Sequence, residues 1–219
     1  VGSVSLFLYH VHRIRPDYEP TRTELNAILC ICRLASGMPL AIMLAAAWMD
    51  VLTPEEISAR LASVDDHRDS VGLALLETDS PGLPERLRSM RRVFDETWSL
   101  LTSQEQRQVA ARSIFRGGVC YEASRAVAKT TLRQIKSCVD ISLLQRQPHG
   151  RYEIHELLRQ YAFSQLAEQG YQRDVIRERY AIYFADEAFK QGKRLGGREQ
   201  LAAIEHMAAD IDNLRLALE

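Results

Sequence analysis

Apolar side chains recur at helical spacing along most of this sequence of 219 residues. One early face is formed at positions i, i+3, i+4 and i+7 by Leu25, Ile28, Leu29 and Cys32. The one convincing β signal is a pair of short segments within residues 142–154, on either side of a Pro-His-Gly turn. The sequence therefore predicts a mainly α protein with a single β-hairpin.

The N-terminal region carries the start and stop signals of a small helical bundle. Thr21 and Glu24 form a capping-box pattern that opens a helix, and Gly37 is expected to end it as the C′ residue. Pro39 then stands at the first position of the next helix, where no N–H donor is needed. That helix, predicted over residues 40–49, is apolar on all sides and should therefore be central.

A second group of helices precedes the hairpin. We expect helices up to Leu101, after Thr102, near residues 121–128 and over residues 132–141, followed by strands on either side of Pro148-His149-Gly150. Helices followed by a two-stranded wing are the order of elements in a winged-helix domain. We therefore predict a winged-helix domain whose wing ends at His155.

Turn-forming residues and helical periodicity divide the chain into four parts. We expect a small helical-bundle domain over residues 1–65, a linker over residues 66–86 and the winged-helix domain over residues 87–170. Residues 171–219 are expected to form a helical pair, with one helix over 173–192 and another over 199–219. One pair could begin a helical-repeat array but does not establish a period.

Charge and hydropathy exclude several classes of function. Lys and Arg total 28 against 29 for Asp and Glu, so a net charge of −1 gives no global reason to expect a nucleic acid or an anionic membrane as partner. No apolar run approaches the length of a membrane span, and no signal peptide is visible, so we expect a cytoplasmic protein. Because the chain begins at Val1 and stops in helical register, we expect it to be a piece of something longer.

Two residues at predicted helix starts are candidate binding residues. His155 stands before an amphipathic helix, where unpaired backbone N–H groups favour an anion such as phosphate. Pro39 offers a rigid apolar face at the start of another helix. Each position also has a purely structural interpretation, because helix starts accept many polar residues and proline is common at the first helical position.

The order of these pieces resembles the nucleotide-switch ATPases called STAND or NB-ARC, and more narrowly the bacterial transcriptional regulators of that class. Gly37-Met38-Pro39-Leu40-Ala41 looks like the family's G-x-P motif. Ile154-His155-Glu156-Leu157-Leu158 looks like its Met-His-Asp segment, with Ile154 in place of Met and Glu156 in place of Asp. In the family these motifs lie in a small helical domain and at the end of a winged-helix domain.

The resemblance implies a cofactor, ADP or ATP, and a partner domain. By resemblance, Gly37 and Pro39 would lie at the adenine and His155 would approach the β-phosphate of ADP. No G-x-x-x-x-G-K-[ST] motif occurs in this sequence, so the phosphate cradle would come from an upstream P-loop domain of the same protein. We therefore expect no enzymatic activity from this chain, weak nucleotide binding at best, and slow ATPase activity in the full-length parent. The implied function is regulatory, in a nucleotide-dependent switch that controls transcription or signalling.

Two other functions are consistent with the residues. A winged helix that binds DNA would use basic residues of the helix over residues 132–141 and of the wing. The candidates are Arg133, Lys136, Arg146 and Arg151. A protein-interaction scaffold would capture a partner, or self-associate, through the C-terminal helices. We identify no catalytic residues and no metal ligands, because the histidines are scattered and no motif for a triad or a zinc site occurs.

Overall fold

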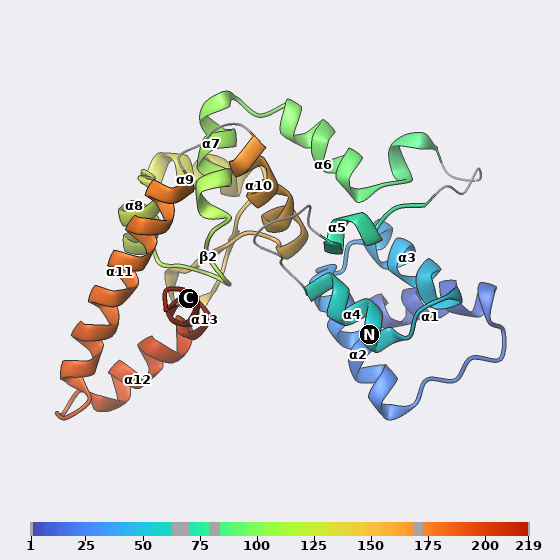
Figure 1. Cartoon of the computed structure of the whole chain (residues 1–219), viewed down its shortest axis with the longest axis horizontal. Coiled ribbons are helices and arrows are strands. Elements are labelled where there is room, and N and C mark those ends of the chain that lie inside the picture. The colour runs from blue at the N-terminus through green and yellow to red at the C-terminus, as the bar shows by residue number, and fades with distance from the viewer. Residues whose placement is uncertain (1, 63–70, 79–83, 169–172, 219) are drawn as a thin grey trace. The chain divides into compact units, whose positions relative to one another are not determined.

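The computed structural model describes residues 2–62, 71–78, 84–168 and 173–218. Its helices carry nearly all of the regular structure, with one two-stranded antiparallel sheet, so the predicted mainly α fold is confirmed (Figure 1). Contacts divide the chain into two compact units. Unit 1 comprises Val1–Leu101 and Glu156–Ser164, and unit 2 comprises Thr102–His155 and Gln165–Glu219.

Unit 1 is a bundle of short helices, with α1 packed against α3 and α2 against α4. The helices are α1 (Gly2–Ile14), α2 (Arg22–Leu34), α3 (Pro39–Ala47), α4 (Pro54–Ala62), α5 (Val71–Leu75) and α6 (Met90–Ser99), together with the first nine residues of α10 (Glu156–Glu168). Both halves of the predicted capping box at the start of α2 are present. In α3, Ala41, Ile42 and Leu44 are at most 1% exposed, which confirms its central position.

The chain leaves α2 through a different residue from the one we expected. Ser36 (φ 42°) and Gly37 (φ 74°) both have positive φ. The N–H of Gly37 donates to the carbonyl of Cys32 at 3.1 Å, and the N–H of Ser36 donates to that of Arg33 at 2.8 Å. This pair of hydrogen bonds makes Ser36 the C′ residue and Gly37 the residue after it. The prediction for Gly37 was wrong by one position, because Ala35 still belongs to the helix end.

Unit 2 contains the predicted winged helix. Its elements are α7 (Ser103–Arg112), α8 (Tyr121–Ala128), α9 (Leu132–Asp140), β1 (Gln145–Arg146) and β2 (Tyr152–Glu153). The two strands are antiparallel and also pair through Tyr152 with Val119, which precedes α8. We call residues 145–153 the wing. The hairpin is shorter than the predicted range of residues 142–154, since β1 begins at Gln145. Leu143 and Leu144, which precede β1, are buried.

The C-terminal helices belong to the same unit as the winged helix. They are α11 (Arg173–Arg194), α12 (Gln200–Ala209) and α13 (Ile211–Leu216). The expected single helix over residues 199–219 was wrong, since the backbone breaks at Asp210 (φ −110°, ψ 15°). On α11, Tyr180 and Phe184 are one helical turn apart, and their rings contact each other and Phe115.

The two units do not follow the domain ranges that we expected from the sequence. Helix α6, expected in the winged-helix domain, groups with unit 1. Tyr161 of α10 explains this grouping: its ring contacts Phe94 and Trp98, and its hydroxyl donates to Asp95 at 2.6 Å. Of the expected linker over residues 66–86, residues 66–70 and 79–83 lie outside the described residues. The remainder includes α5 and a β-bridge from Glu77 to Ser89.

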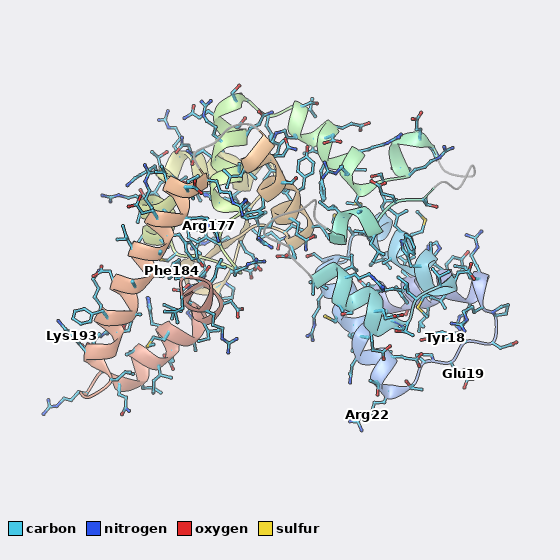
Figure 2. All side chains as sticks on the ribbon, in the orientation of Figure 1. Tyr18, Glu19, Arg22, Arg177, Phe184 and Lys193 are labelled. Carbon is cyan, nitrogen blue, oxygen red and sulfur yellow. The ribbon has the colours of Figure 1, made fainter. Side chains whose placement is uncertain are left out.

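We predict a large difference between two phenylalanines on α11. Phe184 is fully buried, whereas Phe189 is 62% exposed, with the Lys193 ammonium 4.1 Å from the centre of its ring. Figure 2 labels Phe184 and Lys193 on α11. Phe184→Ala should lower the free energy of unfolding by about 3–5 kcal/mol, because it leaves a cavity. Phe189→Ala should change it by roughly 0.5 kcal/mol. Urea unfolding of both variants measures this, and equal losses would show that α11 does not pack as described.

Candidate functional site

The G-x-P segment forms the exposed start of α3. Pro39 is the first helical residue, as predicted, and Met38 is the N-cap, with a side chain that makes no capping hydrogen bond. Pro39 and Gly37 are both exposed. A Cβ built on Gly37 would make an ordinary contact, 3.4 Å from Oγ of Ser3, so the left-handed backbone alone favours glycine here. The Pro39 ring is therefore an accessible apolar face, beside N–H groups that no side chain caps.

His155 lies between the wing and α10. It follows β2 by two residues and directly precedes Glu156, the first residue of α10. Its side chain is half-buried, and both ring nitrogens are buried. The predicted position of His155 at a helix start is confirmed. Whether the ring binds an anion stays a prediction.

Glu156 organises the first turn of α10. Its carboxylate accepts hydrogen bonds from Nε and Nη2 of Arg159, both at 2.8 Å, and from Nε2 of Gln160 at 3.1 Å. Gln160 Nε2 also donates to the carbonyl of Leu61 at 3.0 Å, which ties this turn to the end of α4. An acidic residue here also faces the positive end of the helix dipole. Our sequence reasoning missed Arg159 and Gln160, although their spacing of three and four residues from Glu156 was a visible signal.

Arg151, a candidate DNA contact, is engaged inside unit 2. Its Nη2 lies 2.6 Å from Oδ1 of Asp210 and 3.0 Å from the carbonyl of Ala209, and it also contacts the carbonyl of Gly118. The side chains of Arg151 and Asp210 are 16% and 4% exposed. This ion pair holds the wing against the junction between α12 and α13.

Asn213 extends this contact to two further elements. It is fully buried, and its Oδ1 accepts a hydrogen bond from the N–H of Arg116 at 2.8 Å. Its Nδ2 donates to Oδ1 of Asp210 at 3.2 Å, and the Tyr180 hydroxyl lies 2.9 Å from its carbonyl oxygen. No local pattern predicted this role, because Asn213 is one polar residue within a helical segment. These bonds accompany the helix break at Asp210, whose carboxylate pairs with Arg151 of the wing.

The other candidate DNA contacts lie on the surface of unit 2. Arg133, Lys136 and Arg146 are all exposed. Lys136 pairs with Asp140 at 2.6 Å, one helical turn further along α9. The structure does not gather the four residues that we named into one basic cluster, because Lys136 is paired on its own helix and Arg151 is held by Asp210.

The described residues contain neither a metal-binding cluster nor a helix that could cross a membrane. Within residues 2–62, 71–78, 84–168 and 173–218, no group of three or more His, Cys, Asp or Glu side chains could hold a metal ion. In the same part of the chain, no helix combines the length and the apolar character needed to cross a membrane.

Comparison with known proteins gives relatives in mycobacteria. A protein of Mycobacterium bovis provisionally named an HTH-type transcriptional regulator is 31% identical over 225 residues, and one of Mycobacterium tuberculosis gives the same value. Each match covers 98% of this chain and 24% of the relative. An uncharacterized protein of Mycobacterium bovis is 28% identical over 189 residues, which is 81% of this chain and 46% of that protein. No family model and no solved structure matches.

We predict that unit 2 depends on the charge of Asp210. Asp210→Asn keeps the shape of the side chain but leaves the Arg151 guanidinium without its carboxylate, which should lower the free energy of unfolding by about 3 kcal/mol. Asp212→Asn is the matched control, because Asp212 is 67% exposed and its carboxylate lies 3.6 Å from Arg215. That control should change stability by less than about 0.5 kcal/mol. Thermal and urea unfolding distinguish the two, and similar values would contradict the role of the pair.

We predict that Gly37 is required for its backbone conformation. Gly37→Ala should lower the free energy of unfolding by about 1–2 kcal/mol, because alanine disfavours the left-handed region. Ser36→Gly, the adjacent control at φ 42°, should leave stability unchanged or raise it. Urea unfolding measures both changes. A loss in the second variant and none in the first would show that the chain leaves α2 differently.

Proposed function

We propose that this chain is the regulatory part of a bacterial transcriptional regulator that senses an adenine nucleotide. The observation that carries this proposal is the position of His155, which joins the wing directly to the N-terminus of α10. A residue placed there can connect an anion to a wing strand and to the start of a helix. The similarity to proteins provisionally named HTH-type transcriptional regulators supports the regulatory role.

The nucleotide would be held by residues that differ in chemistry. Pro39 presents an exposed apolar ring on which an adenine base can pack. His155 can donate a hydrogen bond to a phosphate oxygen, more strongly when it is protonated. Because both ring nitrogens of His155 are buried, phosphate binding has to coincide with a rearrangement around the start of α10. ADP would hold the protein closed by this contact, and exchange for ATP would favour an open state.

A second domain has to supply most of the phosphate binding. This sequence has no P-loop motif, so we propose that the chain itself is not an enzyme and that an upstream P-loop domain makes the larger protein a slow ATPase. The chain spans 24% of the length of the regulators that it resembles, which leaves room in such proteins for further domains. A protein with this role would act in the cytoplasm. Its C-terminal helices would bind a further protein partner or mediate self-association.

The test is ADP release from the whole protein that carries this chain. The protein is loaded with a fluorescent ADP analogue, and the dissociation rate is measured after excess unlabelled ADP is added. His155→Ala should raise this rate roughly tenfold, which corresponds to the loss of one hydrogen bond to a charged group. It should also raise basal activity.

His149→Ala is the matched control, since His149 is exposed at the tip of the wing. Its ADP release should equal that of the wild type. If His155→Ala also leaves ADP release unchanged while the protein melts normally, His155 has no sensor role and the proposal fails.

A further inference from the structure

The turn between α8 and α9 borders a surface recess of about 620 Å³. Its walls include two cationic side chains, Arg125 and Lys129, and one carboxylate, that of Glu122. The lining is completed by Tyr121, Ala126, Thr130 and Thr131. Thr131 is the N-cap of α9, so the recess opens at the N-terminus of that helix.

The cations at this recess are available to a ligand. Arg125 and Lys129 are exposed, as is Arg133 in the first turn of α9, and none of the three forms an ion pair with any part of the chain that the structure describes. They recur every four residues through the turn. Lys136 and Arg151, by contrast, are paired with carboxylates. Three exposed cations of the winged helix therefore lie in and beside the α8–α9 turn, and two others, Arg107 on α7 and Arg146 on the wing, are exposed elsewhere.

A buried hydrogen-bond chain holds this turn from behind. Arg112 of α7 is 3% exposed and donates from Nε to Oγ of Ser124 at 3.0 Å. The Ser124 hydroxyl donates in turn to Oγ1 of Thr130 at 3.4 Å. Burial lowers the pKa of Arg112 to about 10, so the guanidinium stays charged at neutral pH and adds positive potential behind the recess. These nearly buried groups therefore link α7 and α8 to the turn.

The backbone of the turn is equally well defined. Lys129 is left-handed at φ 53°, and Thr131 forms a capping box with Gln134. Such a turn holds the backbone positions of these residues fixed, so a ligand that binds several of them does not have to order the backbone.

We propose that Arg125, Lys129 and Arg133, which we call the turn cations, bind the phosphodiester backbone of duplex DNA. Spaced cations in the turn of a helix-turn-helix suit a polyanion with evenly spaced charges. In this class of domain, the helix before the turn crosses the DNA backbone while the next helix presents its N-terminus to the major groove. Contacts from arginine, lysine and helix N-termini to phosphates fix the register of such complexes.

This inference goes beyond nucleotide sensing and does not depend on it. It keeps Arg133 from the DNA contacts that the sequence predicted, and it adds Arg125 of α8 and Lys129 of the turn. Arg146 is exposed on the wing and can add a peripheral contact, whereas Arg151 is held by Asp210. Because the net charge of the chain is −1, binding has to come from this local surface, and it should be sensitive to salt.

Fluorescence anisotropy of the 219-residue chain with a labelled duplex of about 20 base pairs, close to two helical turns, tests the proposal. Three phosphate contacts predict a slope of log affinity against log salt of about −2.7. The test variant combines Arg125→Ala with Lys129→Gly, since glycine keeps the left-handed backbone without strain. It should bind roughly tenfold more weakly at low salt, with a slope of about −0.9.

The control combines Arg22→Ala with Arg198→Ala, which removes two exposed arginines far from the turn in sequence. It should bind the duplex like the wild type, and circular dichroism confirms that both variants fold. The proposal is overturned if the wild type does not bind, or if test and control variants give equal slopes. It is also overturned if inorganic phosphate at constant ionic strength displaces the duplex, because the site would then hold a single small anion.

Discussion

Unit 2 depends on one buried ion pair, between Arg151 of the wing and Asp210 at the junction of α12 and α13. A buried pair contributes little net stability compared with apolar packing, but loss of one partner leaves a charge without compensation. The pair therefore selects one arrangement of the wing and the helices. Asn213 and Tyr180 extend it with hydrogen bonds, so the winged helix and the C-terminal helices fold as one unit.

The two proposed activities use the same physical feature at different places. Helix N-termini leave backbone N–H groups without intrahelical partners, and anions are favoured beside them. His155 stands at the start of α10, and the turn cations surround the start of α9. At the start of α10 the Glu156 carboxylate already supplies a negative charge, and it accepts hydrogen bonds from Arg159 and Gln160. The first turn of α9 carries Arg133 and no acidic residue. A polyanion is thus better accommodated at α9.

Local signals in the sequence predicted most of the elements but little of their assembly. Thr21 with Glu24 predicted the start of α2, and Pro39 that of α3, because caps involve residues only a few positions apart. The hairpin was predicted from its turn. The helix break at Asp210 was not, since its cause is Arg151, 59 residues away in the chain. Likewise, the pattern around Arg112 gave no sign that its guanidinium is buried behind the turn.

By itself the sequence determined where several helices begin, the mainly α class, the winged helix and the position of His155 at a helix start. These follow from periodicity and capping, which act within a few residues. Only the tertiary structure decided which charges are available. Arg151 and Arg133 look alike in the sequence, yet one is 16% exposed beside a carboxylate and the other is exposed in the first turn of α9. The physical reason is that burial and pairing depend on residues distant in the chain, whose approach no local pattern records.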